Sequence, residues 1–383
     1  MTVTTLRGRS LAPDLARGFM LLAIALAHAP VFVSGSPGVL DGVAAFLDHL
    51  LAHNQARPMF VFLFGYALGQ LAYRHHTRGG DWVSLRKLLR RRSLWLIVIG
   101  FVHGVLVPLD IVAVYGLTLL VLAPLVRARD SVLCWTAALT LVPAALVVSA
   151  PIMLAFAGAV DIAGAGMMPS DLGSHLLSGL QTWPLKTVLG TIDIVPGMLL
   201  GIWAARRRIL DEPERHRTLL RRVAVICLGV ALVGRLPGAL LMAGAWMPAV
   251  PSAVVLAHTL TGYAGGIGLA ALIGLVATRA ERARRTTSAG HGPFTTALAA
   301  LGQRSLTFYL FQSVVFLLLF YPFTLDLGDD LGFAAALGIA VAIWAVSVLL
   351  ADWMRRVGHR GPLEVLLRRL TYRRSGRRSS VAP

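Results

Sequence analysis

Two ionisable side chains share one face of the first long apolar segment of the chain. Arg17 and His28 lie eleven residues apart in LARGFMLLAIALAHAPVFV. Eleven residues of α-helix make roughly three turns and rise about 16 Å along the helix axis. The spacing predicts an arginine at one membrane surface below a histidine near the bilayer centre. Ionisable groups in hydrocarbon are costly, so each is a candidate for a reaction centre or a pathway.

Four more polar side chains fall at a similar depth, about 12 to 20 Å from the basic flank of their own segment at 1.5 Å per residue. They are His103, Asp193, Arg235 and Gln312. A lone charge in hydrocarbon is unfavourable by several kcal/mol, so we expect Asp193 and Arg235 to form an ion pair or to face a polar cavity. We predict His28, His103, Asp193 and Gln312 as the catalytic residues. The alternative is a structural ion pair with histidines that serve only in packing.

A second polar group lies at the predicted outer edge of the membrane. Asp48, His49, His53 and Asp110 are predicted to line an outer mouth. His49 and His53 are one helical turn apart, which suits a metal, but such a pair alone is weak evidence and we expect no metal site. The alternative for the stretch LDGVAAFLDHLLAHNQARP is an amphipathic helix that lies flat on the outer leaflet.

The elements that position these side chains are membrane-spanning helices. The chain has 383 residues, of which 56% are hydrophobic and 14% charged, with a mean hydropathy of +0.72. Such values lie outside the range of soluble domains. We predict an all-α, polytopic helical bundle that forms one transmembrane domain over residues 1–372. About ten spans are expected: 14–34, 57–74, 93–108, 109–126, 131–152, 184–205, 222–246, 252–278, 304–323 and 331–352.

The basic residues occur in alternate connections and at both ends of the chain. By the positive-inside rule these segments, with both termini, face the cytoplasm. The net charge of +18 therefore indicates loops that face anionic lipid, and no nucleic-acid partner is expected. We expect a disordered basic tail over 373–383. The Arg- and Ala-rich composition indicates a bacterial source, and the cytoplasmic membrane is the expected location.

The chain lacks the common sequence motifs of soluble enzymes: a Walker-type phosphate loop, a dinucleotide fingerprint, HExxH and GxSxG. Acyl transfer would instead use the basic inner surface, where Arg17 and the cluster Arg90, Arg91 and Arg92 could hold the phosphates of an acyl thioester. A neutral histidine deeper in the membrane could then accept the proton of a hydroxyl or amine. Gln312, Ser305 or Thr307 could donate hydrogen bonds to the oxyanion.

A secondary transporter or exporter is the alternative function. A midplane layer of His, Asp, Arg and Gln side chains is also typical of a substrate or proton pathway. Pro196 and Gly197 could break the sixth span beside Asp193 and expose helix ends to an ion. A non-enzymatic membrane partner is a third reading of the sequence.

Five successive blocks carry a resemblance to a known family. They are ARGFMLLAIALAH, RPMFVFLFGYALG, RRRSLWLIVIGFVHGVLVPLDIVAVYGL, LGQRSLTFYLFQS and RRVGHRGPLEVLLRRLTY. The chain resembles the YeiB-like membrane proteins, the domain-of-unknown-function 418 family. The blocks Ser305 to Ser313 and Gly361 to Tyr372 are the most specific.

That family is grouped distantly with transmembrane acyltransferases, which include the lysosomal heparan glucosaminide acetyltransferase and the bacterial acyltransferase-3 proteins. Arg17 and His28 reproduce the spacing of an Arg and a His in the first span of acyltransferase-3 proteins. The resemblance implies transfer of an acyl group, such as acetyl, from a cytoplasmic acyl-CoA co-substrate. The expected partners are the bilayer, a small-molecule, lipid or glycan acceptor, and a second copy of the chain in a homodimer. No permanently bound cofactor is expected.

Overall fold

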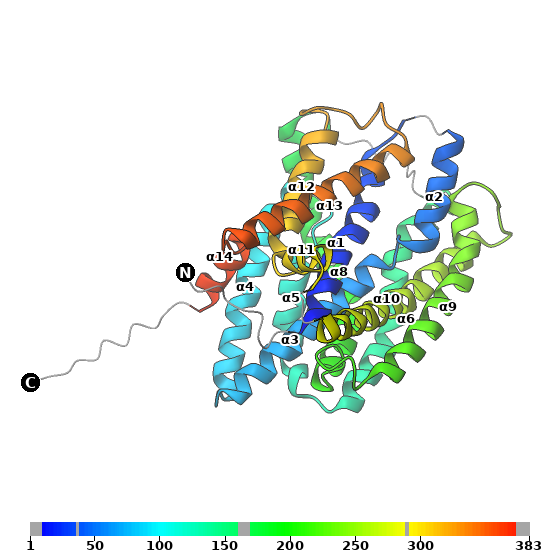
Figure 1. Ribbon diagram of the computed structural model, residues 1–383. Helices are drawn as coiled ribbons and strands as arrows, with labels where there is room; N and C mark the ends of the chain where they lie inside the picture. Colours follow the sequence, from blue (N-terminus) through cyan, green and yellow to red (C-terminus); the bar gives the residue numbers. More distant parts are fainter. Residues whose placement is uncertain (1–9, 36–37, 160–168, 288–290, 373–383) are drawn as a thin grey trace, which may run out of the picture.

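The computed structural model describes residues 10–35, 38–159, 169–287 and 291–372 (Figure 1). Within these ranges the regular structure is helical, which confirms the predicted all-α class. The predicted tail over 373–383 lies outside the described residues. The helices are α1 Leu11–His28, η1 Ala29–Phe32, α2 Val39–Leu51, α3 Ala56–Thr77, α4 Trp82–Leu106, α5 Val112–Leu122, η2 Ala123–Arg127, α6 Asp130–Phe156, α8 Leu172–Arg206, α9 Arg217–Met242, α10 Pro251–Thr287, α11 Pro293–Gly302, α12 Ser305–Phe320, α13 Phe333–Arg356 and α14 Pro362–Thr371.

The number of long apolar helices is smaller than the ten predicted spans. Among the described residues, six helices are long and apolar enough to cross a membrane alone, and α11 with α12 adds a seventh span bent by 84°. The other predicted spans are helical but fall short for physical reasons. Helix α4 has a run of basic residues in its first half, α3 has arginines near both ends, and α5 has only 11 residues.

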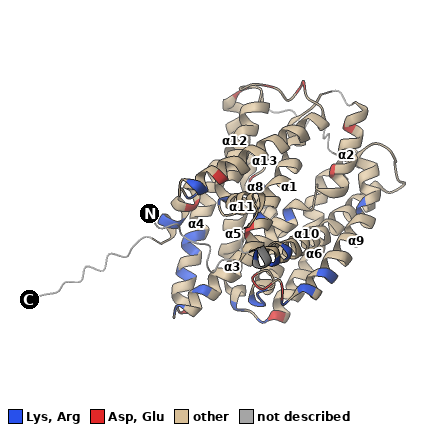
Figure 2. Ribbon diagram, viewed as in Figure 1, with Lys and Arg blue, Asp and Glu red and all other residues tan. Residues whose placement is uncertain are grey.

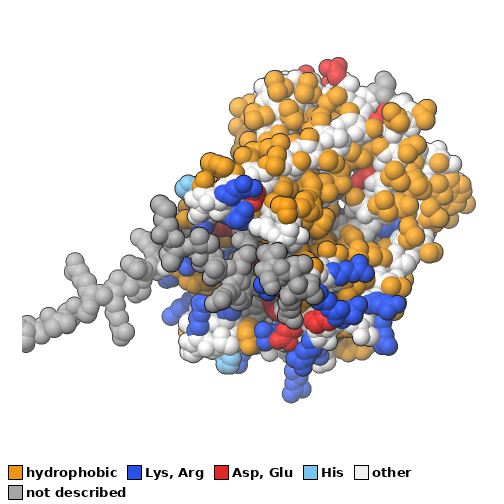
Figure 3. Space-filling model, viewed as in Figure 1, with side chains coloured by type: hydrophobic (Ala, Val, Ile, Leu, Met, Phe, Trp, Pro, Cys, Tyr) orange, Lys and Arg blue, Asp and Glu red, His pale blue; other side chains and the backbone are white. Residues whose placement is uncertain are grey.

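The outer faces of several helices carry large apolar side chains. Leu139 on α6, Val233 on α9 and Leu349 on α13 are all more than 70% exposed. Hydrophobic side chains cover much of the face shown in Figure 3, which includes parts of α2, α9 and α13. A continuous apolar surface of this kind is unfavourable in water and suits contact with lipid tails. The chain is a polytopic helical membrane protein.

Lys and Arg gather at one end of the bundle, around the ends of α3, α4 and α9 (Figure 2). The opposite end, with α2 and the connection from α12 to α13, has few basic residues and several acidic ones. By the positive-inside rule we expect the first end to face the cytoplasm, and we call it the cytoplasmic end. There Asp81 accepts the Ser84 hydroxyl and backbone N–H and caps α4, and these hydrogen bonds hold the pKa of the Asp81 carboxyl below its usual value.

The two most specific sequence blocks contact each other at the cytoplasmic end. The Glu364 carboxylate in α14 accepts the backbone N–H groups of Leu306 and Thr307, at 2.8 and 3.2 Å, at the start of α12. It also accepts the Thr307 hydroxyl. A carboxylate at a helix N-terminus satisfies unpaired N–H groups and interacts favourably with the helix dipole. The α14 helix therefore fixes the beginning of α12, which carries Gln312.

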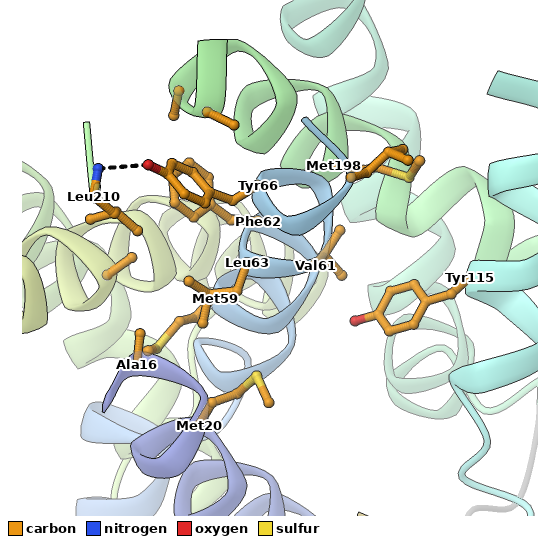
Figure 4. Close-up of a cluster of buried hydrophobic side chains, with 14 of the residues drawn as sticks. Ala16, Met20, Met59, Val61, Phe62, Leu63, Tyr66, Tyr115, Met198 and Leu210 are labelled. Carbon is orange, nitrogen blue, oxygen red and sulfur yellow. Dashed lines mark hydrogen bonds between the residues drawn. The ribbon is translucent and has the colours of Figure 1, made fainter. Parts of the chain in front are cut away.

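Helices α3 and α8 pack closely because both carry glycines four residues apart. A Cβ atom at Gly65 would lie 2.0 Å from the Met198 carbonyl oxygen, and one at Gly201 would lie 2.1 Å from the Phe62 carbonyl oxygen. Small residues at this spacing let two helix backbones approach closely in a membrane. Figure 4 shows buried side chains of α3, including Met59 and Phe62, between α1 and α8.

We expect Gly201→Ala to lower the free energy of unfolding by about 1 to 3 kcal/mol, because the added methyl group forces α3 and α8 apart. Thermal unfolding in detergent measures the change. Gly338→Ala in α13 is the matched control, since nothing lies within 4 Å of a Cβ atom there. Alanine is the better helix former, so the control should keep or raise the midpoint. Equal midpoints for the two variants would contradict the close packing.

Candidate functional site

A histidine and an aspartate form a hydrogen-bonded pair where α4 ends and α5 begins. His103 Nδ1 and Asp110 Oδ1 are 2.7 Å apart, and the two side chains are 4% and 6% exposed. The carboxylate also accepts the backbone N–H groups of Val112 and Ala113, at 3.1 and 2.8 Å. Asp110 therefore caps the start of α5 and fixes the imidazole ring. Because a carboxylate accepts hydrogen bonds, we assign the proton of the neutral ring to Nδ1.

The second ring nitrogen of His103, Nε2, is buried and has no hydrogen-bond partner among the described residues. With the proton on Nδ1, Nε2 carries a lone pair. Buried polar atoms are nearly always paired, so an unpaired one calls for an explanation such as a reacting group. A lone pair on an imidazole oriented by a carboxylate is the arrangement of a general base.

The position of Asp110 corrects its assignment to the outer mouth. After α4 the chain turns at Val107 and Pro108, and Asp110 faces back toward His103 instead of joining the polar residues near α2. Two side chains from other helices satisfy carbonyl groups of this turn. The Tyr309 hydroxyl donates to the Leu109 carbonyl at 2.8 Å, and His175 Nε2 lies 2.9 Å from the Leu106 carbonyl oxygen.

Two more of the predicted catalytic residues lie on helices around His103. His28 at the end of α1 and His103 both have their rings beside that of Tyr309, with centroids 6.3 and 5.3 Å from it. Gln312 lies one turn beyond Tyr309 on α12. It is buried, and its amide oxygen and nitrogen have no partner in the described part of the chain.

Asp193, the fourth predicted catalytic residue, belongs to another set of contacts. Its carboxylate pairs with Arg57 at 3.0 Å and accepts the Tyr263 hydroxyl at 2.6 Å. The predicted pairing of Asp193 with Arg235 is therefore corrected. Both Arg57 and Arg235 lie at suitable depths. The rotation of α8 about its axis turns Asp193 toward α3, which carries Arg57, and not toward α9, which carries Arg235. The Arg57 side chain is 39% exposed, so the ion pair is only partly shielded from its surroundings.

Arg235 is fully buried, and its Nη2 donates to the backbone carbonyls of His49 and His53 at the end of α2. His258 Nε2 also lies 2.9 Å from the His49 carbonyl oxygen. The last carbonyls of a helix lack partners within it, so these side chains complete the end of α2. The charge of Asp48 acts on Arg235.

The remaining residues of the predicted outer mouth do gather in space. The rings of His49 and His53 have centroids 4.5 Å apart, and His53 Nδ1 is 3.7 Å from Asp48 Oδ2. His258, which the sequence analysis did not single out, lies 6.0 Å from His49. Its apolar neighbours in α10 give no sign of this contact. Across the described ranges, no three His, Cys, Asp or Glu side chains form a group suited to a metal ion.

A basic cavity of about 280 Å³ opens at the cytoplasmic end. Arg17, Arg74 and Arg92 line it together with Asp14, which accepts a hydrogen bond from Arg17 at 3.3 Å. Three guanidinium groups and one carboxylate give the lining an excess of positive charge. Phe64 on α3 also lines this cavity.

Only one of the three predicted arginines of α4 reaches this cavity. Arg92 lines it, whereas Arg90 and Arg91 are exposed and are not among its lining residues. The assignment of Arg90 and Arg91 to this cavity is corrected, because successive residues of a helix point about 100° apart. Arg74, which lies on α3, takes their place in the lining.

Part of the chain is similar to a known family of proteins. Residues 204–374 match the sequence model described as "Protein of unknown function (DUF418)". The resemblance to this family predicted from the sequence blocks is confirmed. The "Uncharacterized protein YxaH" of Bacillus subtilis (strain 168) is 26% identical over 370 residues, which cover 87% of this chain and 83% of that protein. The "Uncharacterized 39.9 kDa protein in amylase 3'region" of Bacillus acidopullulyticus is 24% identical over 94% of this chain and 93% of its own length.

Proposed function

We propose that this protein, a helical membrane bundle with a match to DUF418, is an acyltransferase. Its general base is the His103–Asp110 pair. The observation that carries the proposal is the unpaired, buried Nε2 of His103, whose ring is held by the Asp110 carboxylate. The acyl donor is a cytoplasmic acyl-CoA. The acceptor is a hydroxyl or amine that arrives from the outer side of the membrane.

In the proposed reaction, His103 Nε2 takes the proton of the acceptor hydroxyl or amine as its oxygen or nitrogen attacks the thioester carbonyl carbon. The Gln312 amide nitrogen, which has no partner in the described structure, donates to the oxyanion that forms on the carbonyl oxygen. The carbon–sulfur bond then breaks, and the imidazolium returns its proton to the leaving thiolate. The new ester or amide and the free thiol of coenzyme A account for all atoms. The Asp110 carboxylate stabilises the imidazolium in between.

The basic cavity is the proposed site for the phosphates of the donor. Guanidinium groups bind phosphate oxygens through paired N–H groups, and Arg17, Arg74 and Arg92 offer three of them around one space. Arg17 and His28 lie on the same helix, about 16 Å apart along its axis. A donor held by its phosphates at Arg17 would therefore have to extend deep into the bundle to bring its thioester to the histidines.

We expect acetyl-CoA to raise the thermal unfolding midpoint of the purified protein in detergent, because a ligand that binds only the folded state stabilises it. Arg92→Gln should raise the half-saturating concentration about tenfold, the effect of losing roughly 1.4 kcal/mol of binding free energy. Arg91→Gln is the matched control. It removes the neighbouring charge of α4, which is exposed and outside the cavity.

Two outcomes would contradict the proposed donor site. The first is the absence of any midpoint shift with acetyl-CoA or longer acyl thioesters. The second is an equal loss of affinity in Arg92→Gln and Arg91→Gln, which would indicate general attraction to basic charge.

Transport is the second candidate, and the outer group of buried Asp48, His49, His258 and Arg235 with partly exposed His53 favours it. Asp48 and His49 have buried atoms without partners in the described structure, as proton or substrate pathways often do. One predicted argument for transport fails, however. Helix α8 continues through Pro196, so no broken helix ends lie beside Asp193. Transport predicts movement of a solute without a covalent product.

A further inference from the structure

Four aromatic rings form a continuous row between the basic cavity and His103. Phe64 and Tyr115 stack with ring centroids 4.2 Å apart and planes 5° from parallel. Tyr115 also lies 5.0 Å from Phe60, and Phe60 lies 6.3 Å from Tyr309. The Tyr309 ring is 5.3 Å from that of His103. We call the rings of Phe64, Tyr115, Phe60 and Tyr309 the aromatic column.

The column joins the two parts of the proposed site. At its cytoplasmic end, Phe64 lines the basic cavity beside Leu119. At its other end, Tyr309 contacts the rings of His28 and His103. Its members come from α3, α5 and α12, so their contacts can separate without unfolding any one helix. The rings therefore run from the cavity to the histidines.

One polar atom of the column makes no hydrogen bond within the described residues. The Tyr115 hydroxyl is buried and lacks a hydrogen-bond partner in the described ranges. Figure 4 shows the Tyr115 ring projecting from α5 toward α3. An unpaired buried hydroxyl is unfavourable, and a ligand with a carbonyl or amide group would supply the missing partner.

We propose that the aromatic column is the closed passage for the pantetheine arm and acyl chain of the donor, and that Phe64 restricts the entry of long acyl chains. This inference rests on the proposed acyl transfer. The arm is a narrow linear chain that carries amide groups, which suits apolar walls with one hydroxyl. The donor phosphates stay among the arginines while the thioester displaces the rings on its way to His103. Without a ligand the aromatic rings fill the passage. When they move aside, they leave room for a short, unbranched acyl group.

The first test measures the chain-length preference of donor binding. The association rates of labelled acetyl-, butanoyl- and octanoyl-CoA are measured by rapid filtration for the wild-type protein, Phe64→Ala and Phe62→Ala. The wild-type protein should prefer acetyl over octanoyl at least tenfold, and Phe64→Ala should remove that preference. Phe62→Ala is the matched control, because its ring lies on the same helix but beside Tyr66, outside the column. An unchanged preference in Phe64→Ala overturns the inference.

The second test needs no donor, so it separates failure of the passage from failure of the proposed function. The chain has two cysteines, and Cys134→Ala with Cys227→Ala gives a cysteine-free background. In this background Phe60→Cys is labelled with a maleimide added to the cytoplasmic side of inside-out vesicles. Adding Phe64→Ala should raise the labelling rate at least tenfold, while Phe62→Ala should not. Equal rates with and without Phe64 would show that this ring does not close a passage, whatever the donor is.

Discussion

His103→Gln is expected to lower the turnover of acyl transfer by about 10²- to 10⁴-fold while leaving acetyl-CoA binding and the unfolding midpoint nearly unchanged. Removal of a positioned general base has effects of this size. Glutamine keeps similar bulk and a hydrogen-bonding group for Asp110, but it cannot accept a proton at neutral pH. Single-turnover product formation, with donor affinity measured separately, divides the effect between chemistry and binding.

The Asp110→Asn variant tests how His103 is held. Asparagine still accepts hydrogen bonds from the N–H groups that begin α5, so the helix cap should survive. It no longer stabilises the imidazolium, so turnover should fall with a changed pH profile. His258→Gln is the control for loss of a buried histidine, since the hydrogen bonds of His258 are made with His49 and Asn54 and not with the turn that carries Asp110. Full activity in His103→Gln would remove the general base from the proposal.

Arg235→Met is expected to lower the free energy of unfolding by about 2 to 4 kcal/mol, because it leaves two backbone carbonyls without their charged hydrogen-bond donor. The substitution leaves the His49 and His53 carbonyls without the arginine N–H groups and leaves Asp48 without the charge that acts on it. Denaturation of the detergent-solubilised protein measures the loss.

Two further variants show whether the predicted loss comes from these contacts. Arg222→Met lies on the same helix, is exposed, and should change the free energy of unfolding by no more than about 0.5 kcal/mol. Adding Asp48→Asn to Arg235→Met should recover part of the stability, because the second change removes the uncompensated carboxylate. A loss in Arg235→Met no greater than in Arg222→Met would contradict the structural role of Arg235.

Depth along a helix could be predicted from the sequence, whereas the neighbours of each side chain could not. The rise per residue and the basic flanks of the spans placed His28, His103 and Gln312 in one layer, and the structure brings all three beside Tyr309 or one turn from it. Asp193 was also placed at a suitable depth. Its partner was predicted incorrectly, because rotation about the helix axis decides whether it meets Arg57 or Arg235.

The turn between α4 and α5 accounts for another prediction that was wrong, the placement of Asp110. The sequence placed Asp110 after Pro108 at an outer surface, as if the connection between two spans had to lie in water. The structure instead turns the chain there with help from Tyr309 and His175, whose side chains satisfy two carbonyl groups. These contacts come from residues about 70 and 200 positions away in the chain. No short stretch of sequence carries that information.

The burial of His103 and Asp110 has an electrical consequence. Groups at this depth lie within the field of an energised membrane, where moving one elementary charge across the full 100 mV is worth about 2.3 kcal/mol. In the proposed reaction the proton leaves the acceptor and reaches the thiolate through the same nitrogen atom, at nearly one depth. Each turnover then displaces almost no net charge along the field. The membrane potential would neither drive nor oppose the chemistry, and a cell could carry it out equally well when its membrane is de-energised.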